Sequence, residues 1–119
     1  MGFNSISRAR VAEAVVEKFR IVKTGVAVGT CIKAAAANDK LLGTSDELDH
    51  NAGEVVDVSM GTVPKVKLGG AVAVGDALTS DANGKAIATT TIGHRIIGFA
   101  EVAGVLDDVI TYIRAPGVV

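Results

Sequence analysis

The residues of this chain that could do chemistry are an acidic loop, one cysteine and two histidines. The loop, "SDELDHN", contains Asp46, Glu47, Asp49, His50 and Asn51. Hard cations bind several oxygen ligands that converge from a flexible loop, but the spacing here matches no calcium loop and lacks its central glycine. The sequence therefore indicates a solvated charged loop, and we predict no metal site.

The single thiol, Cys31, could form a catalytic pair with His50 or His94. Cysteine is among the most buried residue types, so a small hydrophobic role in the core is the stronger interpretation. The sequence contains no GxSxG elbow, phosphate-binding loop, HExxH motif or CxxC pair. We therefore expect no catalytic residue, no cofactor and no enzymatic activity.

The composition of the 119 residues restricts both the core and the partners. Hydrophobic residues make up 49% of the chain, but it has only three Phe, one Tyr and no Trp. Aromatic side chains bury the most area per residue, so this core is thin and self-association would add to it. The net charge of −1 disfavours nucleic acid and anionic membranes as partners. No apolar run reaches the roughly 18 to 20 residues that span a bilayer, and without a secretory signal or a cysteine pair we expect folding in the cytoplasm.

The elements around these residues follow a repeat with an offset of 55 residues. Residues 29–58 align without a gap on residues 84–113, and Gly29 then matches Gly84 while Gly43 matches Gly98. Because turn glycines and apolar positions match together, the alignment favours two copies of one β unit.

Glycines and alternating apolar residues predict how each unit folds. Segments 63–68 and 77–79 are predicted as strands, and Gly84 is expected in a hairpin turn that needs positive φ. Gly43 and Gly98 interrupt apolar strands, which is typical of bulges and of close backbone approaches. The pattern as a whole predicts an all-β fold, a small β-barrel or sandwich built from the two units.

The N-terminal region is ambiguous between helix and strand. In residues 7–19 a four-residue apolar spacing suits a helix, while the β-branched run into "FRIVK" suits a strand, and we favour extended structure because the neighbouring unit is β. Residues 1–11 are expected to form an extended arm and residues 12–119 a single β domain. A truncation that starts at Ala12 is accordingly expected to keep its stability.

Several segments together resemble the small capsid decoration, or cement, proteins of tailed bacteriophages. They are "FRIVKTG", "LLGTSD", "GGAVAVGDALTSDANGKAI" and "RIIGFAEVA", followed by "VITYIRAP". The resemblance covers residues 12–116 and implies a β-rich protein without a cofactor that binds the outside of an assembled head and reinforces it. The implied partner is the major capsid protein, and the implied location is the capsid exterior of the virion. The arm is longer and more basic than is usual in that family, and we expect it to contact the capsid through Phe3, Ile6, Arg8 and Arg10.

Two other functions stay open. A tail or fibre subunit of a virion would share the glycine-rich β composition. A small β-barrel that binds a ligand or catalyses a reaction would need the acidic loop and His94 in one pocket. The thin core and the symmetry of a shell favour a homo-oligomer, with a trimer ahead of a dimer.

Overall fold

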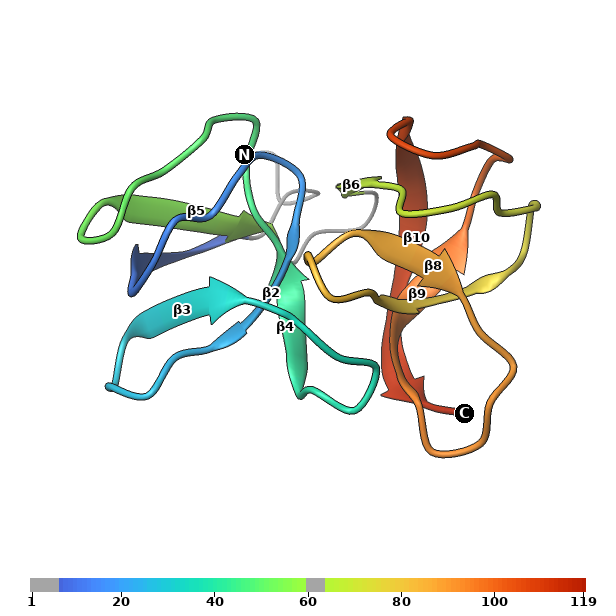
Figure 1. Ribbon diagram of the computed structural model, residues 1–119, viewed down its shortest axis with the longest axis horizontal. Coiled ribbons are helices and arrows are strands. Elements are labelled where there is room, and N and C mark those ends of the chain that lie inside the picture. The colour runs from blue at the N-terminus through green and yellow to red at the C-terminus, as the bar shows by residue number, and fades with distance from the viewer. Residues whose placement is uncertain (1–6, 60–63) are drawn as a thin grey trace, which may run out of the picture.

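The computed structural model describes residues 7–59 and 64–119, and every regular element in these two ranges is a β-strand (Figure 1). The first half of the chain contains β1 (Ser7–Ala12), β2 (Ile21–Thr24), β3 (Thr30–Lys33), β4 (Leu41–Thr44) and β5 (Val55–Ser59). The second half contains β6 (Lys65–Lys67), β7 (Ala77–Ser80), β8 (Ala86–Ala88), β9 (Arg95–Ala100) and β10 (Val109–Val118). The predicted all-β class is confirmed. No helix of the described residues is long and apolar enough to cross a membrane.

The first half is a closed five-stranded barrel with the strand order β1-β3-β2-β4-β5. It closes because β1 pairs with β5 antiparallel and with β3 parallel. Side chains alternate along β5, where Val56 and Val58 are buried and Val55 and Asp57 are exposed, as expected for a strand with one face on a core. The barrel interior holds Ala12, Val16, Val22, Cys31, Val56 and Val58.

The second half repeats the topology of the first. Its strand order is β6-β10-β9-β7-β8. When β6 to β10 are taken as the counterparts of β1 to β5, every pair of neighbouring strands in this order is also a pair of neighbours in the barrel of the first half. The parallel closure between β1 and β3 has a short counterpart in the bridge between Leu68 and Ala86. The two related units predicted from the sequence are therefore present.

The alignment of the two units is not gapless, which corrects the predicted register. The buried residues Ala12 and Val22 correspond to the buried Leu68 and Leu78, an offset of 56. One cause is the first hairpin loop, closed by a bond from Gly25 N–H to Thr30 O, which is one residue longer than the second, closed by a bond from Asp81 N–H to Lys85 O. In the last strand the inward-facing Val56 and Val58 correspond to Ile110 and Tyr112, an offset of 54.

The first half completes the core of the second. Ile21 and Ala34 are fully buried, and together with the partly buried Leu41 they pack among apolar residues of the second half that include Leu68, Leu78 and Tyr112. Backbone bonds join the halves as well, from Ile21 N–H to Gly84 O (2.6 Å) and from Lys67 N–H to Phe19 O (2.8 Å). The two halves share a core and lie side by side (Figure 1).

Residues 7–11, which were expected in the arm, belong to the barrel. Ser7 pairs with Ser59 and Val11 with Val55, so the backbone of β1 is hydrogen-bonded along its length to β5. The physical reason is that β3 and β5 would otherwise leave the barrel open, with unpaired strand edges next to Cys31. The expected boundary at residue 12 is therefore misplaced. The extended structure favoured for residues 7–19 forms over Ser7–Ala12, whereas residues 13–19 are bends and turns around an isolated bridge at Val16.

The two glycines predicted at strand irregularities lie where the pairing shifts. The register between β2 and β4 shifts beside Gly43, where Leu42 is the extra residue. A side chain at Gly98 would collide with the carbonyl oxygen of Ile113 and with Ala115 N, opposite an irregularity in β10. Gly98 thus permits a close approach of β9 and β10 that no larger residue allows.

Candidate interaction surfaces

The acidic loop uses its carboxylates to hold its own backbone. Asp46 Oδ1 accepts hydrogen bonds from Leu48 N–H (3.0 Å) and pairs with His50 Nε2 (2.8 Å), while Asp49 accepts from Lys18 N–H (2.9 Å). Burial acts to raise the pKa of Asp46, but these bonds and one from Asp57 N–H outweigh it and hold the pKa below its ordinary value. Within residues 7–59 and 64–119 no group of side chains is arranged to hold a metal ion.

The cysteine and the histidines have separate structural roles. Cys31 is fully buried in the barrel core, and this burial raises the pKa of its thiol. His94 Nδ1 pairs with Thr89 Oγ1 at 2.7 Å, and His50 pairs with Asp46. In the hydrogen bonds of the described chain neither imidazole contacts Cys31, so the arrangement does not provide an activated thiolate.

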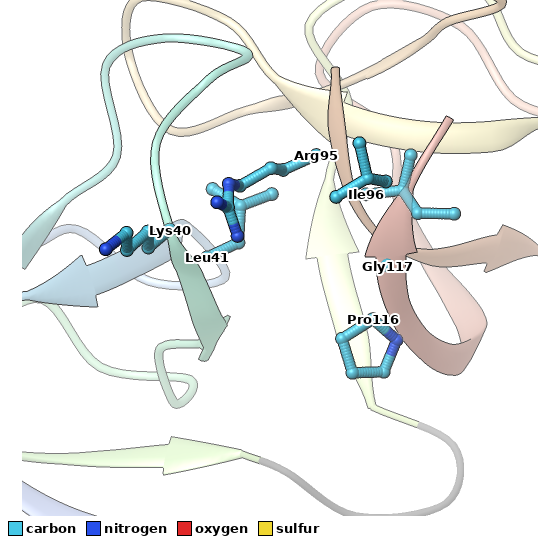
Figure 2. A pocket seen from close by; sticks show the side chains of 7 residues that line it. Lys40, Leu41, Arg95, Ile96, Pro116 and Gly117 are labelled. Carbon is cyan, nitrogen blue, oxygen red and sulfur yellow. The ribbon is translucent and has the colours of Figure 1, made fainter. Parts of the chain in front are cut away.

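A cleft lies between the two halves (Figure 2). Its volume is about 270 Å³, and its lining includes Lys40 and Leu41 at the start of β4, Arg95 and Ile96 at the start of β9, and the end of β10. Lys40 and Arg95 are counterparts in the repeat, so two cations face this space. These side chains include neither a nucleophile nor an acid–base pair, and the cleft offers no chemistry of its own.

The hairpin between β2 and β3 exposes two valines at its tip, residues 25–29, called the first tip below. Val26 and Val28 are 100% and 102% exposed. The loop is held from inside by Glu13, whose carboxylate accepts bonds from Val26 N–H and Ala27 N–H, both at 3.0 Å, and from Thr30 Oγ1 at 2.8 Å. These bonds, the one from Ala27 first, lower the pKa of Glu13. The first tip is thus a fixed apolar projection.

A second apolar surface lies on two neighbouring loops of the second half, residues 71–76 and 101–108, called the apolar loop pair below. Val72 and Gly104 exchange two backbone hydrogen bonds, of 3.0 and 3.2 Å, which hold the loops together. Their exposed apolar side chains are Val74, Val102, Val105 and Leu106. In the first half the corresponding two loops include the acidic one and expose two large apolar residues, Val15 and Leu48. The second half therefore exposes more large apolar side chains on these loops than the first half does on the equivalent loops.

The predicted contact residues are only partly described. Phe3 and Ile6 lie outside the described residues. The backbone of Arg8 pairs with Val58 in the barrel. Arg10 lies beside the first tip, where it lines a shallow pocket together with Ala9, Val28 and Gly29.

Sequence reasoning missed the first tip as a surface. The available signal was that Val26 and Val28 stand directly before the turn glycine Gly29, where polar residues or glycine are usual. A turn that carries two β-branched apolar residues without a buried partner is a candidate contact site.

Comparisons with known proteins agree with this fold. The model of a family described as phage cement protein matches residues 6–113. Among solved structures, the head fiber gp8.5 N base of bacteriophage phi29 is similar, with a TM-score of 0.71 and 21% sequence identity over 93% of this chain and 94% of that chain. At this identity the likeness establishes the fold alone. No curated protein matches the chain significantly in sequence.

Proposed function

The chain belongs to the phage cement protein family, and from this premise we propose that it reinforces an assembled phage head without catalysing a reaction. The family match over residues 6–113 is the observation that carries the proposal. The protein is a structural component of the virion that binds the capsid. The absence of enzymatic activity is supported by the positions of the residues that could take part in catalysis. Asp46 and His50 pair with each other in a loop, and Cys31 fills the core.

The mechanism requires only selective binding. A ligand that binds an assembled state and not its separated subunits stabilises the assembly by mass action, to an extent set by its concentration relative to its Kd. A β domain that lies across the junction of neighbouring capsid subunits has this property. The proposed partner is accordingly the major capsid protein in its assembled form.

The apolar loop pair is the surface proposed to contact the shell. Val102, Val105 and Leu106 are exposed next to Val74, and burying such side chains against a partner yields about 25 cal/mol per Å² of apolar area. The loops are held by backbone bonds, so little conformational entropy is lost on docking. The N-terminal residues Phe3 and Ile6, with Arg8 and Arg10, are proposed to add a second contact.

The test is binding to purified undecorated heads. The double variant Val105→Asp/Leu106→Asp should bind heads at least about tenfold more weakly than the wild type, since two exposed apolar contacts would be replaced by charges. Leu48→Asp, in the corresponding loop of the first half, is the matched control and should bind normally. Sedimentation of heads with bound protein measures both. Wild-type binding by the double variant would remove the apolar loop pair from the contact, and failure of the wild-type chain to bind any assembled shell would overturn the proposed function.

A second candidate is the base of a head fibre. The observation that favours it is the structural likeness to the head fiber gp8.5 N base, which covers nearly the whole of both chains. Imaging of decorated heads distinguishes the two, because a base carries a projecting fibre at its sites and a cement protein forms a layer of density without one.

Self-association is proposed as part of the function, with a trimer ahead of a dimer. Its support is the thin core, in which Tyr112 is the only fully buried aromatic side chain among the described residues. Symmetric sites on a shell also favour symmetric oligomers.

A further inference from the structure

The two halves carry equivalent hairpin tips with different surroundings. Gly29 in the first tip and Gly84 in the second tip, residues 81–84, share nearly the same backbone conformation, with φ of 78° and 72°. A side chain at Gly84 would lie 2.6 Å from Lys33 Cγ and 2.9 Å from Ile21 O, because the second tip is docked on the first half. At Gly29 nothing lies within 4 Å.

The first half holds the second tip by a small set of polar contacts. Ile21 N–H donates to Gly84 O at 2.6 Å, and Arg20 Nη1 donates to Asn83 O at 2.9 Å. Arg20 is buried, and the stem of Lys33 covers Gly84. The contact thus joins backbone carbonyls of a polar hairpin to a site with two cations, which also pair with Glu17.

The second half contains the counterpart of this receiving site. The bond from Ala34 N–H to Ile21 O is repeated by the bond from Thr89 N–H to Ala77 O, and the bond from Ser45 N–H to Arg20 O by that from Ala100 N–H to Asp76 O. By this equivalence Arg20, Ile21 and Lys33 correspond to Asp76, Ala77 and Ala88. At this place the second half has an open groove of about 490 Å³, lined by residues 75–77 and 88–90 and by Phe99. None of the described hairpin tips occupies it.

The side chains of the first tip and of the open groove both differ from those of their docked counterparts. In the tips, Asn83 of the second half stands where the first half has Val28, and the first tip, which is one residue longer, also carries Val26. In the receiving sites, Lys33 of the first half is replaced by Ala88, and the half-exposed Phe99 lies beside it. The polar tip on a site with two cations thus has as its counterpart an apolar tip and a groove that presents Ala88 and Phe99 beside Asp76.

We infer that the first tip of one copy docks in the groove of a second copy, so that the contact within the chain continues between chains. The inference rests on the self-association proposed above and assigns a surface to it. The two tips point in the same direction, toward the left in Figure 1, so the contact between copies is head to tail. Contacts of this kind use two different patches on each copy and close into a ring when a rotation accompanies them. Gly29 then lies beside Ala88, as Gly84 lies beside Lys33 within the chain, and the neighbouring Val28 enters the groove.

The first test is a disulfide cross-link with two separate variants, Val28→Cys and Ala88→Cys. Mixed under oxidising conditions, they should give several times more covalent dimer than either variant alone, because position 28 of one copy lies next to position 88 of another. The wild-type chain is the control, since its own thiol at Cys31 is buried. A lack of cross-linking in the mixture would overturn the inference, and so would a Val28→Cys dimer that dominates, because that result indicates a tip-to-tip contact.

The second test separates this surface from the one proposed for the shell. Val26→Asp/Val28→Asp should weaken self-association at least about tenfold in sedimentation equilibrium, and the variant should keep the circular dichroism of the wild type because both side chains are exposed in the single chain. Val105→Asp/Leu106→Asp should self-associate normally but bind phage heads more weakly. Unchanged self-association of the tip variant would refute the docking contact and leave head binding, measured on its own, as the criterion for the proposed function.

Discussion

At the scale of single residues, the polar groups of this protein stabilise loops and the junction between the halves. Glu13 accepts two hydrogen bonds from a loop backbone, and Asp46 accepts one from Leu48 N–H and pairs with the His50 imidazole. Tyr112, the only tyrosine, is fully buried, and its hydroxyl lies 3.3 Å from Thr44 Oγ1 of the other half. Burial raises the pKa of Tyr112 to about 12, with the bond to Thr44 acting in the opposite direction.

This raised pKa predicts a loss of stability in alkali. A phenol whose pKa is higher in the folded state contributes fully below its unfolded pKa, near 10, and the contribution is lost as the pH rises through about 12. With the folded pKa at about 12, the loss should reach on the order of 2 kcal/mol at that pH. Urea unfolding from pH 8 to pH 12 measures it. Tyr112→Phe should lack this component and lose about 1 kcal/mol at neutral pH with the hydroxyl, so an equal alkaline loss in both chains would contradict the assignment.

At the scale of strands, β1 is the element whose role differs most from expectation. Its five pairs with β5 and its parallel contact with β3 close the barrel. The core residue Ala12 lies at its end, beside the buried Cys31. Removing β1 would therefore open the barrel.

Two truncations separate the arm from the strand. A chain that starts at Ser7 keeps β1 and should melt like the full chain, and weaker binding of it to heads would assign a contact to the residues before Ser7. A chain that starts at Ala12 loses the strand, and its melting temperature should fall by about 10 °C or more, which reverses the expectation from sequence. Thermal melts followed by circular dichroism measure both. Equal stability of the two truncated chains would show that β1 contributes little.

The sequence predicted the strands well and their closure poorly. Local patterns identified β6 and β7, and the turn glycine identified the hairpin at Gly84, because these signals depend only on neighbouring residues. The segment of β1 combines small residues with Arg8 and Arg10, which on its own resembles a basic arm. Its pairing partner lies more than 40 positions away in β5, and no local pattern encodes that contact. The first tip was missed for a similar reason, since only the structure separates an exposed valine in a turn from one that is covered.

At the scale of the whole molecule, the junction between the halves includes a close approach of two backbone segments. The second tip docks on the first half through Gly84, and the shared core contains Ile21 and Ala34. The halves should therefore unfold together as a single cooperative unit.

A matched pair of glycine variants tests the junction. Gly29→Ala and Gly84→Ala place the same side chain at nearly the same positive φ, so each should lose about 1 kcal/mol of stability from backbone strain. Gly84→Ala adds a collision with Ile21 O and Lys33, and its total loss should reach about 3 kcal/mol or more. Denaturant unfolding gives the difference between the variants. Equal losses would mean that the tip can withdraw from the first half without cost.

Because Cys31 is buried, the rate at which its thiol is modified can be used to measure how often the barrel opens. A fully buried thiol reacts with a labelling reagent only while the strands around it are apart, so the rate of modification at excess reagent reports how often the barrel opens. No other cysteine is present to obscure the signal. The rate of labelling can then be measured for the free protein and for the protein bound to a phage head. A slower reaction on the head would show by what factor binding to the shell reduces the rate of barrel opening.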